Sequence, residues 1–375
     1  MITADVAVIG GGPAGARTAE RIASLGYDTL IIEKDAYAGE TNVCGGSMDL
    51  AFAEGIDVPS EFTKVIDRWV YYFPFKVVEV RSRNLSFSRK NFDRYLADRA
   101  VRRGAHLLCR TLATQAQVSH DSVRISVLAR ESGESKVIES KVAVFADGPS
   151  TLAHKSFGIG FHGTPKNMAV GAIYEFEQDG GNDSYDLFFD PLISPWGYGW
   201  IFPKLDHLNV GVTCLVARSP TNLKACLDYL AFKHPVASKK LEGRRKLRFA
   251  AASIPLAPAD RLSSTRVMTV GDAAGMVDAI WGGGIGWGLR ASELVARVAS
   301  EALEANKFDA SFMARYDNLW KRTSDYLLLK NFERLTNITL PLQRLYANAY
   351  PRLVQFLVWN SERSKRRGQI PQPVH

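Results

Sequence analysis

The chain has 375 residues, with 46% hydrophobic and 23% charged residues and a formal net charge of +8. This length exceeds what one hydrophobic core usually serves, and the composition is that of a globular protein rather than a disordered chain. The sequence lacks an apolar run of about 18 residues and a basic leader, so we expect neither a transmembrane helix nor a signal peptide. Its widely spaced cysteines argue against a disulfide or zinc framework, and we expect a cytoplasmic protein without a metal site.

The first predicted element is a short buried strand at residues 6–9, which leads directly into a glycine-rich turn. Gly10, Gly12 and Gly15 in this turn form the pattern G-x-G-x-x-G. In such a turn the first glycine allows a tight bend, the second lets a pyrophosphate approach the backbone, and the third lets the following helix pack on the strand. That helix is expected over residues 16–26, where apolar residues recur at helical spacing.

A second strand is expected over residues 28–35, with Glu33 near its end. A carboxylate at this place accepts hydrogen bonds from a ribose and disfavours the 2′-phosphate of NADP. Strand, glycine turn, helix, strand and acidic residue together predict a dinucleotide-binding unit, and they leave FAD and NAD as alternatives.

Two later motifs place an aspartate beside a glycine at the end of a predicted strand. One is Asp147 with Gly148, and the other is Gly271 with Asp272, which follows a strand at residues 267–270. A carboxylate at a strand end can accept hydrogen bonds from a polyol such as the ribityl chain of FAD. A simple NAD-dependent dehydrogenase does not need this pair of aspartate–glycine motifs, so the motifs favour FAD over NAD.

Glycines at 282–284 follow the second motif and precede a long amphipathic helix, which we expect from about Leu289. The N-terminus of such a helix offers backbone N–H groups and a positive dipole end to an electron-rich ring or a phosphate. This again fits a flavin.

With these motifs in this order, the chain from residue 2 to about residue 305 resembles the para-hydroxybenzoate hydroxylase-type group of FAD-dependent flavoproteins. The resemblance implies that Asp272 contacts the ribityl chain and that the backbone at Ala113 holds the adenine. Arg89, Phe92 and Asp93 match the group's R-x-x-F-D pattern, in which the arginine approaches the FAD phosphate and ribityl region. The cofactor-binding residues expected are Gly10, Gly12, Ala14, Gly15, Glu33, Lys34, Cys44, Gly45, Arg89, Ala113, Asp147, Gly148, Gly271, Asp272, Gly283, Gly284 and Ile285.

Two segments narrow the resemblance to the geranylgeranyl reductase family, whose members reduce isolated prenyl double bonds. Residues 44–46 match its C-G-G segment, and "YGWIFP" at residues 198–203 matches its Y-x-W-x-F-P motif. Flavin halogenases instead carry a W-x-W-x-I-P pattern and a catalytic lysine. The family often reads G-E-G-I where this chain has Gly283, with Trp281 and Trp287 nearby, so the sequence leaves the substrate open.

The resemblance implies an α/β fold with an α+β insertion. Its parts are a Rossmann-like FAD-binding domain, a β-sheet substrate-binding domain and a C-terminal helical segment. We expect the FAD-binding domain to comprise residues 1–75, 76–160 and 261–308, the antiparallel substrate sheet residues 161–260, and the C-terminal helices residues 309–375.

The function implied is FAD-dependent reduction of a carbon–carbon double bond in a hydrophobic, isoprenoid substrate. An isolated alkene has no carbonyl to take up charge, so hydride transfer from the flavin N5 must be matched by a proton from a positioned acid. We expect Cys44 to deliver this proton or to tune the flavin, although a role as a small buried hydrophobe is an equal alternative. Tyr198 and Trp200 are the other candidate catalytic residues.

Aromatic residues alternate along the segment around residue 200, which predicts a strand with one apolar face. Such a stripe is more often core than pocket, and the resemblance favours a strand whose aromatic face lines the pocket. The substrate-binding residues expected are Trp196, Tyr198, Trp200, Phe202, Pro203 and Trp281, and the aromatic residues at 69–73 could form the opposite wall.

The electron donor is expected to be NAD(P)H, which needs no separate domain in this group, or a reduced ferredoxin as a partner protein. Two other functions remain as alternatives. One is an FAD-dependent monooxygenase or halogenase-like enzyme acting on an aromatic natural product, and the other is a flavin-binding carrier without turnover. A nucleic-acid partner is not expected.

From Asp309 onward the sequence becomes helical in pattern. Apolar residues at 353–359 are followed by a basic cluster at 363–367 that contains Arg363, Lys365, Arg366 and Arg367. Such a helix either docks on the body of the protein or makes a peripheral contact with an anionic membrane surface.

Overall fold

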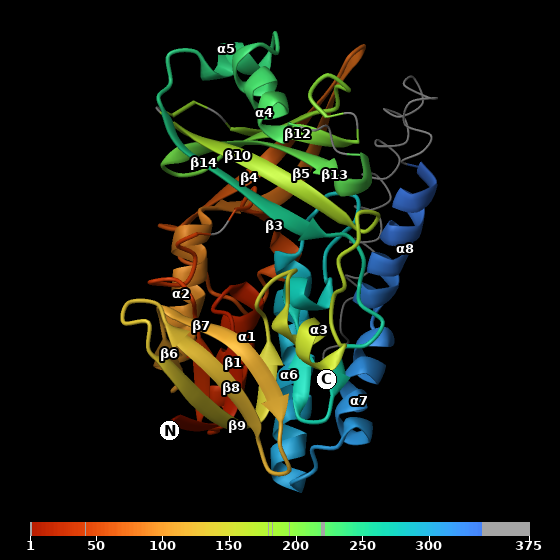
Figure 1. The fold of residues 1–375 in the computed structure, drawn as a ribbon. Helices are drawn as coiled ribbons and strands as arrows, with labels where there is room; N and C mark the ends of the chain where they lie inside the picture. Colours follow the sequence, from red (N-terminus) through yellow and green to blue (C-terminus); the bar gives the residue numbers. More distant parts are fainter. Residues whose placement is uncertain are drawn as a thin grey trace, which may run out of the picture.

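Two β-sheets, one in each half of the molecule, organise the fold (Figure 1). The structure is a computed structural model and describes residues 2–339 apart from residues 42, 179, 182, 195 and 219–221. Within the described residues the first sheet, sheet A, has the strand order β15-β16-β9-β1-β2-β6, with β7 and β8 attached through β9. Its strands are β1 (Ile2–Ile9), β2 (Thr29–Ile32), β6 (His106–Leu108), β7 (Thr111–Val118), β8 (Val123–Ala129), β9 (Ser135–Phe145), β15 (Ser263–Ser264) and β16 (Val267–Thr269).

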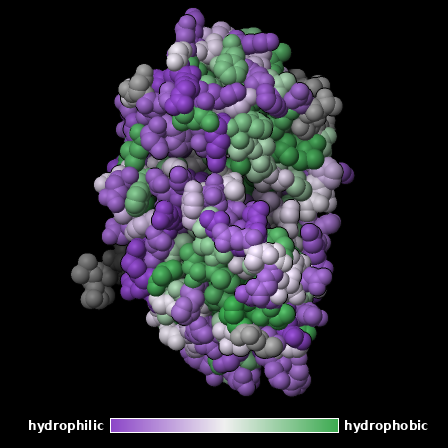
Figure 2. All heavy atoms as spheres, turned by 60° about the vertical axis from the view of Figure 1, so that its left-hand side comes forward, coloured by the Kyte–Doolittle hydropathy of each residue, from purple (hydrophilic) through white to green (hydrophobic). Residues whose placement is uncertain are grey.

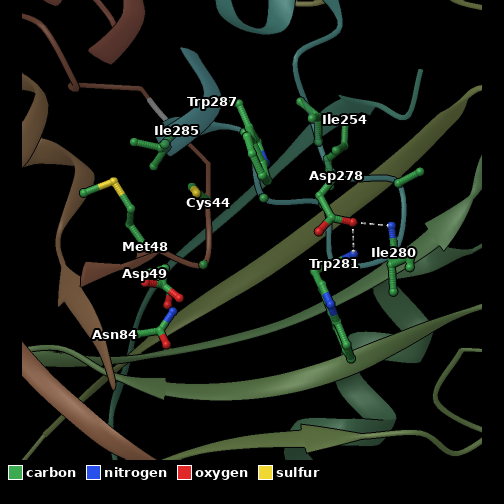
Figure 3. Close-up of a pocket in the computed structure, with 18 of the residues that line it drawn as sticks. Cys44, Met48, Asp49, Asn84, Ile254, Asp278, Ile280, Trp281, Ile285 and Trp287 are labelled. Atoms are coloured by element: carbon green, nitrogen blue, oxygen red, sulfur yellow. Dashed lines mark hydrogen bonds between the residues drawn. The ribbon is translucent and has the colours of Figure 1, made fainter. Parts of the chain in front are cut away.

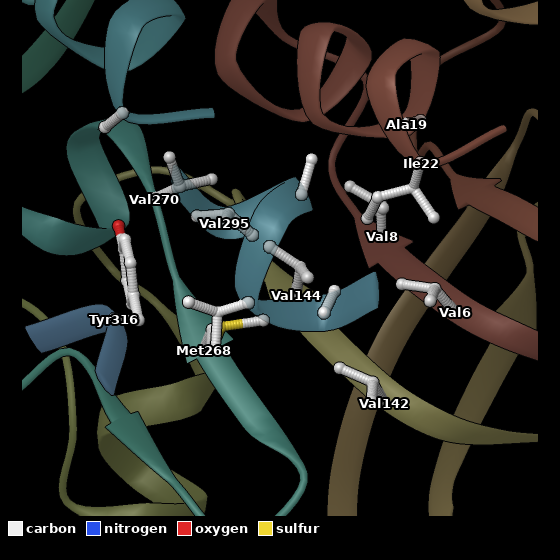
Figure 4. Packing of buried hydrophobic residues seen from close by; sticks show 14 of the residues in the cluster. Val6, Val8, Ala19, Ile22, Val142, Val144, Met268, Val270, Val295 and Tyr316 are labelled. Atoms are coloured by element: carbon white, nitrogen blue, oxygen red, sulfur yellow. The ribbon is translucent and has the colours of Figure 1, made fainter. Parts of the chain in front are cut away.

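Strand β1 lies in the interior of sheet A, parallel to both of its neighbours, β2 and β9. Its side chains alternate between two hydrophobic clusters, with Val6 and Val8 on one face and Ala7 and Ile9 on the other. This explains why the strand reads as a continuous apolar run. Figure 4 shows the first cluster, formed between the sheet and helices α1 (Pro13–Ala23), α6 (Ile285–Ala305) and α7 (Ala310–Lys321).

The second sheet, sheet B, has the strand order β14-β10-β13-β12-β11-β4-β5-β3. Its strands are β3 (Ser47–Asp49), β4 (Thr63–Phe73), β5 (Lys76–Phe87), β10 (Met168–Glu177), β11 (Ser184–Phe188), β12 (Gly197–Pro203), β13 (His207–Leu215) and β14 (Lys246–Pro255). Helices α4 (Leu223–Phe232) and α5 (Ala237–Leu241) pack on one face. The other face is directed toward the half of the molecule that contains sheet A (Figure 1).

The expected α/β architecture is confirmed, while the structure divides the chain differently between the two sheets. Strands β4 and β5 form a hairpin that pairs with β11 and β3 in sheet B, so residues 63–87 do not belong to the FAD-binding half. The expected boundary between residues 75 and 76 falls inside this hairpin. The pairing depends on β11, more than 100 residues further along the chain, and local sequence carries no signal for it.

The remaining helices are α2 (Arg89–Arg102), α3 (Leu152–Phe157) and α8 (Ser324–Thr339). In α7, Tyr316 and Trp320 are buried in the same cluster as β1, so this helix docks on the body of the protein. The apolar and basic segments at 353–367 lie outside the described residues. Among the residues that are described, no helix is both long and apolar enough to cross a membrane. The face in Figure 2 is largely hydrophilic, with apolar residues in separate patches.

Candidate active site

The glycine turn after β1 leaves one side of its backbone open. A Cβ atom on Gly10 would lie 2.4 Å from the Ala146 carbonyl oxygen, and one on Gly15 would lie 2.0 Å from the carbonyl oxygen of Gly10. These two glycines are therefore required by close packing. A Cβ on Gly12, in contrast, would meet nothing within 4 Å. The free space at Gly12, at the N-terminus of α1, fits a bound pyrophosphate.

Glu33 is held rigidly beside this turn, just beyond the end of β2. Its Oε2 accepts a hydrogen bond of 2.7 Å from the N–H of Gly11, and its Oε1 accepts one of 2.9 Å from the N–H of Asp35. Burial raises the pKa of this carboxyl, and the two backbone bonds oppose the rise. The side chain of Lys34 is exposed, whereas its carbonyl accepts from Arg130.

Three elements converge at Ala14, in the first turn of α1. A Cβ on Gly271 would lie 2.9 Å from the Cβ of Ala14, and a Cβ on Gly288 would lie 3.0 Å from it. Small residues at all three positions therefore bring the glycine turn, the Gly271–Asp272 motif and α6 together. This contact places motifs that are far apart in the sequence around one site.

Two predicted aspartates have oxygen atoms available for a ligand. Asp147 uses Oδ2 to accept from the N–H of Leu152 at 2.7 Å, while its buried Oδ1 has no hydrogen-bond partner among the described residues. Asp272 lies deep in the molecule, yet its side chain is accessible because it faces an internal cavity. Burial raises the pKa of Asp272 and the nearby Arg89 lowers it. The buried unpaired oxygen of Asp147 and the cavity-facing carboxylate of Asp272 both fit the hydroxyl groups of a ribityl chain or ribose.

The cavity that Asp272 faces has a volume of about 1670 Å³. It is bounded by the apolar face of sheet B, the segment at residues 43–54, the turn at 277–287 and one face of α8. Figure 3 shows Cys44 and Met48 on one side of the cavity and Asp278 and Trp281 on the other. Asp278 Oδ1 accepts from the N–H groups of Ile280 and Trp281 and so shapes the turn.

The aromatic stripe of β12 faces this cavity. Tyr198, Trp200 and Phe202 lie on one face of the strand with the aromatic cluster that lines the cavity, whereas Ile201 packs on the opposite face under α4. The stripe is thus both core and cavity wall. Pro203 was expected among the substrate contacts but does not line the cavity, because strand alternation turns it away; its carbonyl accepts from Ser86.

Both polar aromatic residues of the stripe already use their donor groups. The hydroxyl of Tyr198 donates to the backbone carbonyl of Trp281 at 2.5 Å, and the indole Nε1 of Trp200 donates to Oδ1 of Asn209 at 2.8 Å. Trp69 and Tyr71 lie beside them on the same face of sheet B, through β11, and not on an opposite wall. Tyr72 points to the other face, where its ring stacks on Phe188.

The segment at residues 44–46 crosses the cavity near Arg89. The guanidinium of Arg89 forms a bidentate ion pair with Asp93, at 2.6 and 2.7 Å. Burial disfavours the charge of Arg89, but Asp93 and the sulfur of Cys44 outweigh this and raise its pKa. The N–H of Gly46 donates to the Cys44 sulfur at 3.3 Å. Cys44 therefore lies between a fixed cation and the open cavity.

The cavity brings together most of the residues predicted for the ring and the substrate. Those that line it are Cys44, Gly45, Arg89, Trp196, Tyr198, Trp200, Phe202, Asp272, Trp281, Gly283, Gly284 and Ile285. The residues predicted for the dinucleotide do not line it and lie along sheet A and α1. Ala113 lies in β7 beside a register shift in its pairing with β8.

Sequence reasoning missed several residues that the structure brings to the site. Lys204 and Asn209 hold the segment at 44–46, and Phe52 packs edge-on against Trp287 at the cavity wall, with ring centroids 4.6 Å apart. Lys204 directly follows the aromatic motif in a polar turn, which is ordinarily a surface position. Helical and strand periodicity give no signal for these side chains, because their partners are distant in sequence.

Comparison with known proteins gives related sequences and folds. Residues 5–68 match a family described as FAD binding domain. The digeranylgeranylglycerophospholipid reductase 2 of Methanopyrus kandleri is 30% identical, over 89% of this chain and 87% of the relative. The digeranylgeranylglycerophospholipid reductase of Methanocaldococcus jannaschii is 28% identical, over 86% of this chain and 84% of the relative.

Among solved structures, a geranylgeranyl bacteriochlorophyll reductase-like protein from Thermoplasma acidophilum aligns with a TM-score of 0.80 and 24% identity, over 95% of this chain and 99% of the other. A flavin-dependent brominase aligns with a TM-score of 0.71 and 16% identity, over 91% and 90% of the two chains. At these identities the structural likeness establishes the fold alone.

Proposed function

The chain belongs to the geranylgeranyl reductase family of FAD-dependent flavoproteins, and from this premise we propose how its site works and what it acts on. It is an FAD-dependent oxidoreductase that reduces carbon–carbon double bonds of a hydrophobic isoprenoid substrate. Its substrate, in our proposal, is a lipid that carries a geranylgeranyl-type chain, because its relatives are named digeranylgeranylglycerophospholipid reductases.

The observation that carries this proposal is the large cavity between the 44–46 segment, the glycine turn at 282–284 and the aromatic face of sheet B. Pockets for compact ligands usually measure about 300–1,000 Å³, so a volume of about 1670 Å³ leaves room for a flavin ring together with a long chain. The aromatic side chains offer a rigid apolar wall, which suits a flexible isoprenoid and excludes water from it.

Bound FAD supplies a hydride from N5 to one carbon of the double bond. The chain's own residues hold the cofactor and deliver the proton. We assign the pyrophosphate to the backbone at Gly12, a ribose to Glu33, and hydroxyl groups of the cofactor to Asp147 and Asp272. These assignments are supported by the open space at Gly12 and by the unpaired or cavity-facing oxygens of the two aspartates.

We assign proton delivery to the thiol of Cys44. Tyr198 and Trp200 already donate to protein acceptors, so their role in the proposal is to shape the wall beside the double bond. Cys44 lines the cavity, and the guanidinium of Arg89 lies close enough to its sulfur to interact electrostatically.

One observation disfavours the halogenase-like alternative. Among the described residues that line the cavity there is no lysine, whereas the halogenase pattern includes a catalytic one. Lys204 is adjacent to the cavity wall, but its ammonium group is occupied by protein acceptors. We therefore keep the monooxygenase and halogenase functions only as outcomes that the experiment must separate.

The proposal is tested by anaerobic photoreduction of the FAD-loaded protein, followed by addition of geranylgeranyl lipids, prenyl diphosphates and prenylated quinones. Mass spectrometry should show a gain of two hydrogen atoms on a geranylgeranyl lipid without oxygen. Product that forms only in air and carries an added oxygen would instead support a monooxygenase. A flavin that cannot be reduced and reoxidised would support a carrier.

The electron donor is tested in the same preparation. We propose NAD(P)H or a reduced ferredoxin as the electron donor. Each candidate donor is added separately without oxygen, and the one that bleaches the flavin absorbance is the donor. A peripheral membrane contact through the basic residues at 363–367 is a separate proposal. The protein should sediment together with vesicles of anionic lipid, and neutralising those residues should abolish this co-sedimentation.

A further inference from the structure

The three consecutive carbonyl groups at residues 44–46 are each bound by a side chain from the adjacent strands of sheet B. Asn209 Nδ2 donates to the carbonyl of Cys44 at 3.1 Å. Lys204 Nζ donates to the carbonyl of Gly45 at 2.5 Å and to that of Gly46 at 2.8 Å. Lys204 follows β12 directly and Asn209 lies in β13, and the N–H of Phe87 at the end of β5 also donates to the carbonyl of Gly46, at 3.0 Å. All of these donors come from sheet B.

Asn209 joins the segment to the aromatic wall. Its Oδ1 accepts from the indole N–H of Trp200, and its Nδ2 donates to the Cys44 carbonyl. An indole nitrogen can only donate and a carbonyl can only accept, so this pair of partners fixes the orientation of the amide. The wall residue Trp200 and the backbone of Cys44 are therefore linked through one side chain.

Lys204 is 1% exposed, and its ammonium group has three acceptors in place. Besides the two carbonyls, Nζ donates to the hydroxyl of Ser86 at 3.0 Å. An ammonium group has three N–H donors, and all three are used. Removing this side chain would leave the carbonyl of Gly45 without its donor, and the carbonyl of Gly46 with only the backbone N–H of Phe87, at 3.0 Å. An unpaired polar group away from water is costly.

Packing leaves the segment little freedom to move away from these side chains. A Cβ on Gly45 would lie 3.2 Å from the ring of Phe202, so the backbone here rests on the aromatic wall. Gly46 has a φ of +60° and its Cβ would lie 2.2 Å from the Phe87 carbonyl oxygen, so this position needs glycine. The segment is thus fitted to sheet B by packing as well as by hydrogen bonds.

We propose that Lys204 and Asn209 are positioning residues that lock residues 44–46 to the aromatic wall, so that the Cys44 thiol and the substrate surface keep one fixed geometry. The consequence for turnover rests on the proposed function, in which Cys44 serves the reduction. The locking of the segment does not depend on the proposed function, and it can be measured on the FAD-loaded protein without substrate.

The test is amide hydrogen exchange of the FAD-loaded protein, followed by mass spectrometry of peptides that cover residues 43–48. Lys204→Met keeps a side chain of similar length and removes all three donors. Asn209→Asp keeps the acceptor for Trp200 and removes the donor to Cys44. The matched control is Lys240→Met. Lys240 belongs to α5 and pairs with Asp186 on the face of sheet B that is turned away from the cavity.

We expect exchange in this peptide to become at least tenfold faster in Lys204→Met and several-fold faster in Asn209→Asp, with no change in Lys240→Met. Peptides from α7 report whether each variant is folded. If Lys204→Met does not fold, the exchange rate of the Asn209→Asp variant alone tests the proposal. Unchanged exchange at residues 43–48 in a folded variant would overturn the proposal.

A second measurement separates this inference from the proposed function. With an alkene substrate, both variants should lose at least tenfold in kcat while KM changes less than threefold, because the cavity walls that bind the chain remain. Faster exchange without alkene reduction by the wild-type protein would refute the proposed function and leave the positioning role intact. If both variants reduce the alkene as fast as the wild type and exchange at residues 43–48 is unchanged, the positioning role is refuted.

Discussion

The indole ring of Trp200 occupies the space that a Cβ atom on Gly211 would need. The two residues are paired across β12 and β13, and a Cβ at position 211 would lie 2.1–2.7 Å from three atoms of the ring. The glycine lets the ring lie flat across the neighbouring strand while its N–H reaches Asn209. The cavity wall therefore depends on a residue that has no side chain.

Gly211→Ala is predicted to displace Trp200 and to destabilise the protein by about 1–3 kcal/mol, the usual cost of overpacking. The same change should lower kcat/KM for alkene reduction, because the displaced ring enters the cavity or releases Asn209. Chemical denaturation and steady-state kinetics measure the two effects. Gly171→Ala is the control, since it lies on the same cavity face and its Cβ would meet only Ile254 at 3.4 Å and Val212 at 3.8 Å. Equal behaviour of the two variants would contradict the steric argument.

Cys44→Ser tests the proposed proton donor. A hydroxyl is nearly isosteric with the thiol and is a far weaker acid, so kcat for alkene reduction should fall by about 10²-fold or more, the lower end of what general acids contribute. FAD content and the rate of flavin reduction should stay as in the wild type.

Cys226→Ser provides the comparison, because this partly exposed cysteine lies in α4, on the far face of sheet B. A Cys44→Ser enzyme with wild-type kcat would assign the thiol to packing alone. A loss of FAD from this variant would instead show that Cys44 supports the cofactor.

The dinucleotide half of the fold was predictable because its signals are local. The apolar run at β1, the spacing of Gly10, Gly12 and Gly15, and Glu33 at the end of β2 all lie within one short stretch. Each is tied to a backbone requirement that the structure contains, such as the close approach of Gly15 to the Gly10 carbonyl. The aromatic face of β12 was predictable for the same reason, since alternation is a local property.

The rest depends on contacts that no local pattern encodes. The hairpin of β4 and β5 joins sheet B through β11, and Lys204 is buried only because the carbonyls of Gly45 and Gly46 reach it from about 160 residues earlier in the chain. Read locally, "FPKLD" is a polar turn in which a lysine would be solvated. Long-range register and acceptor placement decide such positions, and one sequence does not specify them.

Asp272→Ala is predicted to weaken FAD binding by about 10- to 100-fold, because hydrogen bonds to a charged group contribute about 1.5–3 kcal/mol. The folded protein should otherwise be little changed, since no hydrogen bond to this carboxylate from the described residues is found. Titration of the apoprotein with FAD, followed by quenching of flavin fluorescence, gives the affinity.

The exposed Asp260 supplies the control, as Asp260→Ala removes one negative charge away from the cavity. Both variants should have the same midpoint of unfolding in the absence of FAD. An Asp272→Ala protein that binds FAD as tightly as the control would remove this residue from the cofactor site.

Burial lowers the pKa of Lys204 to about 7, against 10.5 for an ordinary lysine. Cys44, Asp206 and Glu175 oppose the drop. A second, smaller cavity lies beside Lys204 and is lined by the cationic side chains of Arg89, Lys90 and Arg248 and by the imidazole of His207. Below pH 7 the amine is protonated in both the folded and the unfolded chain, whereas between about pH 7 and 10.5 only the unfolded chain holds the proton.

The free energy of unfolding should therefore rise with pH between about 7 and 10.5, by at most about 1.4 kcal/mol per pH unit from this group. Other groups also titrate in this range, so the quantity to measure is the difference between wild type and Lys204→Met. Denaturant unfolding at half-unit steps from pH 6 to 9.5 should give a difference that is constant below pH 7 and grows above it in favour of the wild type. Lys240→Met should not show this growth, because pairing with Asp186 raises the pKa of Lys240. A flat difference across the whole range would mean that the buried amine keeps its proton, held by its three acceptors despite the cost of burial.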